Sequence, residues 1–209
     1  MTATDDTDTA RPAEPRVPTA ADRYHAGAFL AILIAGVIGL WASFVLSVDA
    51  IALAEDPLAD LSCNISEKIS CAVVGTTWQA NLLGFPNAFF GLIGQTVVIT
   101  IAVAALGGVR FPRWFMVGAE LGFAAGLAFA FWLFAQSFFV IDALCPWCTV
   151  LYVTTLVSFA ALTRVNILEG NLGAGTRQRL ERPLRLGMDT FAVLILLGAL
   201  AAMIVYKYV

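Results

Sequence analysis

Five long apolar stretches constrain the fold of this chain more than any other feature. Each is close to the roughly 20 residues that a helix needs to cross the hydrocarbon core of a bilayer. A segment in lipid must satisfy its backbone hydrogen bonds internally, and a helix does so within a single stretch. The predicted spans are Ala26–Val48, Phe85–Leu106, Trp114–Val140, Pro146–Thr163 and Met188–Tyr206.

The composition supports these spans. Hydrophobic residues make up 60% of the 209 residues, and charged residues make up 13%. A soluble domain carries about 25% charged residues, so a soluble globular protein is excluded. The sequence therefore predicts an all-α integral membrane protein, and we expect no nucleic-acid partner.

The polar segments divide the chain into four parts. Residues 1–22 are rich in Thr, Ala, Pro and Asp and are predicted to be a disordered cytoplasmic tail. Residues 23–165 hold the first four spans, with an outer loop at residues 49–84. Residues 166–187 are predicted to be a basic cytoplasmic loop, and residues 188–209 a fifth transmembrane helix.

The basic residues predict the orientation, because Lys and Arg concentrate in cytoplasmic segments. With the N-terminus inside, the outer segments hold only Lys68 and Lys207, and the C-terminus is outside. All four cysteines then lie on the outer side, where disulfides form and persist. The inner segments hold ten arginines: Arg11, Arg16, Arg23, Arg110, Arg113, Arg164, Arg177, Arg179, Arg182 and Arg185.

The motif "CPWC" places Cys145 and Cys148 at the start of the fourth span. Pro146 suits the first position of a helix, so Cys145 is predicted to be the N-cap and Cys148 to lie in the first turn. The positive end of the helix dipole stabilises a thiolate there, which favours a redox pair. A structural disulfide is the alternative, but so small a ring stabilises a fold little.

A second pair, Cys63 and Cys71, encloses the polar loop "NISEKIS". Taken alone, this pair is typical of a structural disulfide within a loop, exposed to soluble partners. Two pairs in one compartment can instead pass electrons by thiol–disulfide exchange. Zinc bound by four cysteines is the rival arrangement, but the spacing does not fit the usual zinc motifs, and we expect no metal.

Electrons that enter such a relay need an acceptor, and inside a bilayer the obvious acceptor is a lipid-soluble quinone. Tyr152 lies four residues after Cys148 and therefore on the same helix face. Asn87 lies just inside the second span, where an amide is costly unless it faces a site or the interior of a bundle. The alternatives are an interfacial aromatic for Tyr152 and a helix-start residue for Asn87.

The stretches "CNISEKISC", "GFPNAFFG" and "CPWCTVLY", in this order, resemble the bacterial members of the vitamin K epoxide reductase (VKOR) family. The resemblance implies a four-helix catalytic bundle around a quinone, here with a fifth helix and no fused thioredoxin-like domain. It implies that Cys145 and Cys148 form the active-site pair and that Cys63 and Cys71 form the shuttle pair. Asn87 and Tyr152 match the residues that contact the quinone, either menaquinone or ubiquinone.

The function implied is that of a quinone-dependent thiol–disulfide oxidoreductase in the bacterial cytoplasmic (inner) membrane. It would oxidise a DsbA-like thioredoxin-fold partner outside the cytoplasm and so support disulfide bond formation. Two alternatives stay open: reduction of a vitamin K epoxide or quinone in another physiological direction, and a non-enzymatic membrane protein with structural disulfides.

Overall fold

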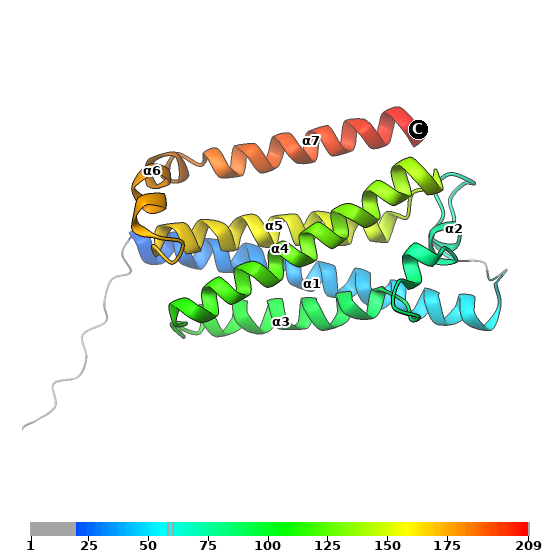
Figure 1. Cartoon of the computed structure of the whole chain (residues 1–209), viewed down its shortest axis with the longest axis horizontal. Coiled ribbons are helices and arrows are strands. Elements are labelled where there is room, and N and C mark those ends of the chain that lie inside the picture. The colour runs from blue at the N-terminus through cyan, green and yellow to red at the C-terminus, as the bar shows by residue number, and fades with distance from the viewer. Residues whose placement is uncertain (1–19, 58, 60, 209) are drawn as a thin grey trace, which may run out of the picture.

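The computed structural model of the protein describes residues 20–57, 59 and 61–208. Five helices in this part of the chain are long and apolar enough to cross a membrane, as predicted. The chain is therefore an all-α, multi-pass membrane protein (Figure 1). The five helices are α1 (Ala20–Glu55), α3 (Ala88–Leu106), α4 (Arg113–Gln136), α5 (Pro146–Leu168) and α7 (Met188–Tyr208).

Four shorter helices connect the spans. Between α1 and α3, the outer loop contains α2 (Cys71–Gly75) and the 3-10 helix η1 (Trp78–Asn81). A π-helical turn, η2 (Ser137–Ile141), extends α4 towards the second cysteine pair. The basic segment between α5 and α7 contains α6 (Ala174–Arg185).

The first four spans form a bundle in which α1 packs along both α3 and α5, and α4 packs against α5. The largest apolar cluster lies in one half of this bundle, between the middle of the spans and the end that carries α6. Its members are Phe29, Ile32, Val98, Ile101, Ala102, Met116, Phe123, Leu162 and Val165. A second cluster, with Leu53, Leu61 and three of the cysteines, lies at the opposite end. The halves therefore differ, and the cysteines share one end.

A buried carboxylate lies near the α6 end of the bundle. Glu120 on α4 is 8% exposed and accepts hydrogen bonds from Thr163 and from the amide of Asn166, the latter at 2.8 Å. Asn166 also donates to the Met116 carbonyl at 3.2 Å. Because these polar groups satisfy one another, Glu120 ties α4 to α5 and has a structural role here.

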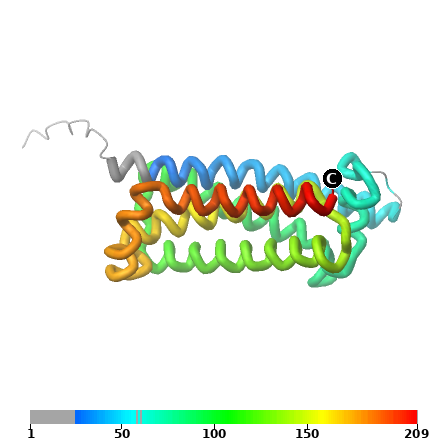
Figure 2. Tube along the Cα trace, turned by 90° about the horizontal axis from the view of Figure 1, so that it is seen from above, coloured from blue at the N-terminus to red at the C-terminus, as the bar shows by residue number. Residues whose placement is uncertain are grey.

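The fifth helix runs along the outside of the bundle (Figures 1 and 2) and is attached near its two ends. At one end Asp189 pairs with Arg164 at 2.9 Å. At the other end Lys207 pairs with Asp142 at 2.8 Å and donates to the Phe138 carbonyl. The second contact fixes the turn that leads into the cysteine motif, where Asp142 has a left-handed backbone conformation with φ of 59°.

Several of the predicted helices were too short. Helix α1 continues to Glu55, so residues 49–55 belong to a helix and not to the outer loop. The sequence "DAIALAE" has no helix breaker, and the helix ends just before Pro57. The sequence "RVNIL" likewise has no helix breaker, so α5 continues to Leu168. The predicted basic loop also contains a helix, α6. Ala20–Asp22 begin α1, and the rest of the predicted tail lies outside the described residues.

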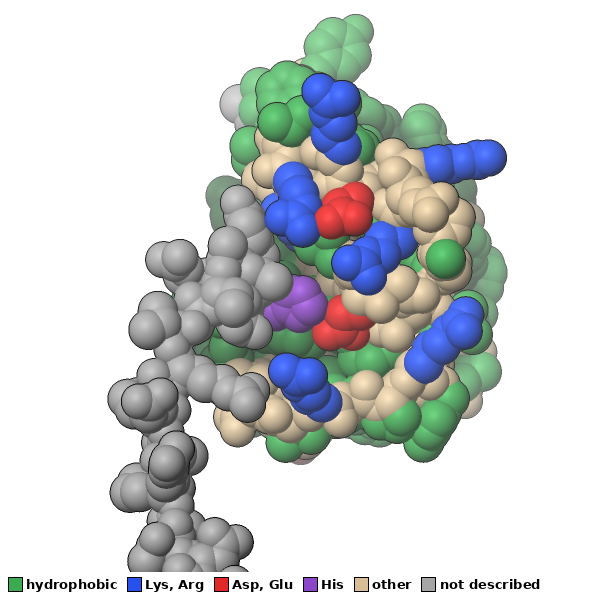
Figure 3. All heavy atoms as spheres, turned by 90° about the vertical axis from the view of Figure 1, so that its left-hand side faces the viewer, with side chains coloured by type: hydrophobic (Ala, Val, Ile, Leu, Met, Phe, Trp, Pro, Cys, Tyr) green, Lys and Arg blue, Asp and Glu red, His purple; other side chains and the backbone are tan. Residues whose placement is uncertain are grey.

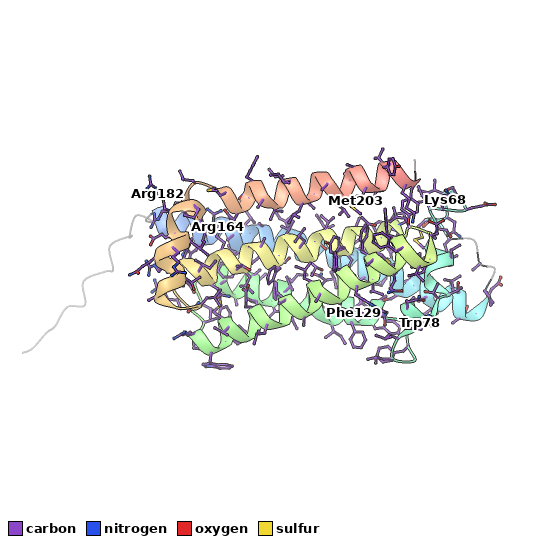
Figure 4. All side chains as sticks on the ribbon, turned by 45° about the horizontal axis from the view of Figure 1, so that its top comes forward. Lys68, Trp78, Phe129, Arg164, Arg182 and Met203 are labelled. Atoms are coloured by element: carbon purple, nitrogen blue, oxygen red, sulfur yellow. A yellow bond between two sulfur atoms is a disulfide. The ribbon has the colours of Figure 1, made fainter. Side chains whose placement is uncertain are left out.

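The two ends of the bundle differ in charge. Lys and Arg side chains gather over the end that carries α6 (Figure 3). Arg164 and Arg182 lie at this end, whereas Lys68 lies at the other (Figure 4). This is the asymmetry that the sequence predicted from its basic residues.

Candidate active site

Backbone hydrogen bonds bring the two cysteine segments together. The Ser70 amide donates to the Leu144 carbonyl at 3.0 Å, and the Leu144 amide donates to the Lys68 carbonyl at 2.8 Å. These bonds form an isolated parallel bridge between Ile69 and Leu144. Each bridge residue is followed closely by a cysteine, Cys71 on one side and Cys145 on the other. The bridge therefore sets the distance between the pairs.

The pair in the loop between α1 and α3, called the outer pair from here on, is a disulfide between Cys63 and Cys71, whose Cα atoms are 5.7 Å apart. Asn64 fixes the start of α2, because its side-chain oxygen accepts hydrogen bonds from the Ser70 hydroxyl at 2.8 Å and the Ala72 amide at 3.2 Å. The prediction that this disulfide is exposed was wrong: Cys63 is 5% exposed and Cys71 3%. Apolar loop residues such as Leu61 pack over the sulfurs.

Cys145 and Cys148 at the start of α5, called the inner pair from here on, have the predicted local geometry. Cys145 is the N-cap of α5, Pro146 occupies the first turn, and the Cys145 sulfur accepts the Cys148 amide at 3.3 Å. Both thiols are free. The Cys148 side chain and the backbone amides of Cys148 and Trp147 lower the pKa of Cys145, against burial and the nearby Asp49 carboxylate. A thiolate is therefore favoured at Cys145.

The two pairs meet sulfur to sulfur. Cys145 Sγ lies 3.5 Å from Cys71 Sγ, and both residues are buried. Thiol–disulfide exchange begins when a thiolate contacts a disulfide sulfur, and this contact has that arrangement. The side-chain atoms of Asp49, Cys63 and Cys71 that could bind a metal ion also lie within 4.8 Å of one another. In the disulfide state two of these three offer no thiolate to a metal ion.

A cavity of about 400 Å³ lies beneath the cysteines, inside the membrane-spanning part of the bundle. Its size is within the range of small-molecule sites. Five of the six predicted site residues line it: Cys71, Cys145, Cys148, Asn87 and Tyr152. The structure thus brings together the residues that the sequence assigned to one site.

Asn87 is the N-cap of α3, and its side chain holds the roof of the cavity. Its amide nitrogen donates to the Gln79 carbonyl at 2.6 Å, and its oxygen accepts the Leu82 amide at 3.3 Å. Both contacts tie η1 and the residue after it to the start of α3. One N–H of the Asn87 amide is left for a ligand after these two bonds.

Tyr152 presents its ring flat against Phe134 of α4, with ring centroids 5.5 Å apart and planes 12° from parallel. Within the described residues its hydroxyl makes no hydrogen bond. The stacking holds the ring in place, so the hydroxyl is a pre-oriented donor at the cavity wall.

Sequence reasoning missed two polar residues deeper in the cavity. Gln95 on α3 and Ser158 on α5 line it and are buried, and the oxygen atoms of both side chains lack a hydrogen-bond partner in the described part of the chain. Gln95 had the signal that singled out Asn87, an amide within an apolar span. Ser158 gave none, because a serine hydroxyl in a membrane helix commonly bonds to its own backbone.

The cavity reaches the surface of the bundle between α3 and α4. Gly94 and Val97 of α3 and Gly122 and Gly126 of α4 line it and are exposed. A Cβ atom added at Gly94 or Gly122 would meet no atom within 4 Å. Three of these four border residues are glycines, so most of the opening is bordered by residues without a side chain, at the level of the apolar spans.

The model of the vitamin K epoxide reductase family matches residues 30–163, which is more than half of the chain. The protein belongs to this family. It is therefore a VKOR homologue and a membrane oxidoreductase with a redox-active cysteine centre. The matched residues include both cysteine pairs, Asn87 and Tyr152, and end before α6 and α7. No curated protein matches the chain.

Proposed function

We propose that this VKOR homologue oxidises a DsbA-like thioredoxin-fold protein outside the cytoplasm and passes the electrons to a membrane quinone, so that it supports disulfide formation. The contact between Cys145 Sγ and Cys71 Sγ at 3.5 Å carries this proposal. It joins a disulfide at the outer end of the bundle to a thiol pair that lines an apolar cavity.

The relay begins with both pairs oxidised. A partner thiolate attacks Cys63, the Cys63–Cys71 bond breaks, and Cys71 leaves as a thiolate. Cys71 then attacks Cys145, and Cys148 leaves as a thiolate. The second partner thiol attacks the partner's own sulfur in its bond to Cys63, which releases the oxidised partner and returns Cys63 as a thiol.

The outer disulfide then closes. Cys63 attacks Cys71, the Cys71–Cys145 bond breaks, and Cys145 is released. Two electrons and two protons have moved from the partner to the inner dithiol. The structure has this distribution, with the outer pair joined and the inner pair free.

The residues around the cavity fit a quinone, which would supply a two-electron acceptor of the kind this family uses in general. Cys148 is the inner thiol that would face the ring, and Tyr152 and Asn87 each have an N–H or O–H to offer a ring oxygen. Aromatic and aliphatic side chains make up most of the remaining wall. Either menaquinone or ubiquinone has the chemistry required.

One consequence concerns access to the outer pair. Because Cys63 is 5% exposed, the thioredoxin-fold partner must displace part of the loop before it can reach the sulfur. A rigid outer loop would slow partner oxidation without affecting the inner pair.

The alternatives gain less support. Two structural disulfides would leave the close approach of Cys145 to Cys71 without a role. Reduction of a vitamin K epoxide would use the same cysteines and the same cavity, so the direction of electron flow is what separates it from the proposal.

The proposal is tested with the purified protein in lipid nanodiscs. A reduced DsbA-like protein is added with ubiquinone-1 or menadione, and quinone absorbance and the partner's thiols are followed together. We expect the loss of one quinone for each disulfide formed in the partner. Partner oxidation that proceeds equally without quinone, or no quinone loss with any dithiol, would contradict the proposal.

A labelling experiment tests the proposed orientation in the cytoplasmic membrane. In a variant whose native cysteines are serine, Ile65→Cys and Leu186→Cys give single thiols at residues that are 72% and 73% exposed. We expect a membrane-impermeant maleimide to label the first in intact cells and the second only after permeabilisation. The reverse pattern would place the cysteine end in the cytoplasm.

A further inference from the structure

Asp49 has no role in the relay as described, yet it contacts one of its sulfurs. Its Oδ2 atom lies 3.5 Å from Cys63 Sγ. The continuation of α1 beyond Val48 carries this half-buried carboxylate up beside the outer pair. A disulfide sulfur has no proton to donate, so the contact can become a hydrogen bond only when the disulfide is open.

Three cysteines lie around Asp49, each on a different element, and each of them can titrate only when it is a free thiol. They are Cys63 from the outer loop, Cys71 from α2 and Cys145 at the start of α5. The Cys63 sulfur lies within hydrogen-bonding distance of the Asp49 carboxylate. Cys145 is near enough for the carboxylate to oppose its ionisation. The carboxylate thus lies at the cysteine that must lose a proton for the outer disulfide to close.

We propose that Asp49 is a catalytic base that takes the proton of Cys63 as the outer disulfide closes, an inference that rests on the proposed relay. Cys63 Sγ attacks Cys71 Sγ in the Cys71–Cys145 bond. The Cys63–Cys71 bond forms, the Cys71–Cys145 bond breaks, and Cys145 leaves with the electron pair as a thiolate. The proton of Cys63 moves to Asp49, and no outside oxidant is needed.

The site is organised for this direction at both ends. Cys63 is buried, and burial disfavours the thiolate that the attack requires, so a base beside it has a large effect. Cys145 is the better leaving group, because the first turn of α5 stabilises its thiolate. The base at the attacking sulfur speeds the exchange, and stabilisation of the departing thiolate favours its inward direction.

The test uses the full chain with Cys148→Ser, which removes the inner disulfide and leaves three cysteines that share one disulfide. No quinone or partner is needed. A jump from acidic to neutral pH shifts the balance between the Cys63–Cys71 and Cys71–Cys145 disulfides. The free thiol is Cys145 in the first form and Cys63 in the second, and the two ionise differently because the helix start lies beside Cys145 and Asp49 lies beside Cys63. Acid quenching, alkylation of the free thiol under denaturing conditions and mass spectrometry give the relaxation rate.

We expect Asp49→Asn in this background to slow the relaxation about a hundredfold, the lower end of the range for a general-base effect. The rate should then rise about tenfold per pH unit, because hydroxide must form the Cys63 thiolate, whereas the parent should vary little near neutral pH. Asp49→Glu should restore much of the rate. Glu55→Gln, an exposed carboxylate at the end of the same helix, should leave it unchanged.

Two results would overturn the proposal in different ways. If Asp49→Asn relaxes as fast as the parent, or faster, the carboxylate is only a neighbouring negative charge, and the relay itself stands. If no variant forms the Cys71–Cys145 disulfide, the contact between the two pairs is not used, and the relay fails together with the role of Asp49.

Discussion

Cys145→Ala should reduce quinone reduction by the partner to the uncatalysed background. Cys145 is the inner cysteine whose sulfur lies 3.5 Å from the outer disulfide, so its removal breaks the path between the pairs. The remaining thiol, Cys148, then has no partner with which to form a disulfide. Loss should be complete with the reduced partner and with small dithiols alike, as measured by quinone absorbance in nanodiscs.

Cys63→Ala is the matched control for this result. It removes the sulfur that the partner attacks in the proposed relay but leaves the inner pair and the cavity intact. We expect it to abolish quinone reduction by the partner and to preserve quinone reduction by a small apolar dithiol that reaches Cys148 through the cavity. Equal loss with the small dithiol in both variants would show that the outer pair is not a separate shuttle.

Tyr152→Phe should slow quinone reduction about ten- to a hundredfold. Reduction places negative charge on the ring oxygens in an apolar site, where a hydrogen-bond donor counts for more than in water. Loss of one bond to such a charge costs roughly 1.5 to 3 kcal/mol. Phenylalanine keeps the stacking on Phe134, so the change isolates the hydroxyl.

The companion variant Asn87→Ala has a second effect, because it also removes the two hydrogen bonds that hold η1 over the cavity. We expect a larger loss of activity and a higher KM for quinone than in Tyr152→Phe, with the disulfides still able to form. Steady-state kinetics at several quinone concentrations separate the two effects. An unchanged rate in both variants would mean that the quinone binds elsewhere.

The parts of this site that depend on local sequence could be predicted. The N-cap position of Cys145 follows from the proline after it, and five spans follow from five apolar stretches. Asp49 was placed in a loop because the apolar stretch ends at Val48, although a helix ends where its backbone is interrupted and not where its side chains become polar. Spans judged by hydropathy alone therefore end too early.

No local sequence pattern indicates the long-range contacts of the site. The Ile69–Leu144 bridge joins segments that are distant in the sequence, and it is this bridge that brings Cys71 to Cys145. The burial of Cys63 under apolar loop residues was missed for the same reason, since "NISEKIS" is polar in itself. The family resemblance predicted which cysteine pair is the shuttle and which is the active site, but the distances between the pairs could be obtained only from the structure.

The opening between α3 and α4, bordered by Gly94 and Gly122, changes what substrate concentration means for this protein. A molecule that passes through it arrives by two-dimensional diffusion in the plane of the bilayer and never as a free solute in water. For the proposed quinone, the quantity that sets occupancy of the cavity is then its mole fraction among the surrounding lipids. Added lipid should lower this mole fraction even when the molar concentration of quinone stays the same. Rates in detergent and in membranes should therefore be compared at the same mole fraction of quinone in the detergent or lipid phase.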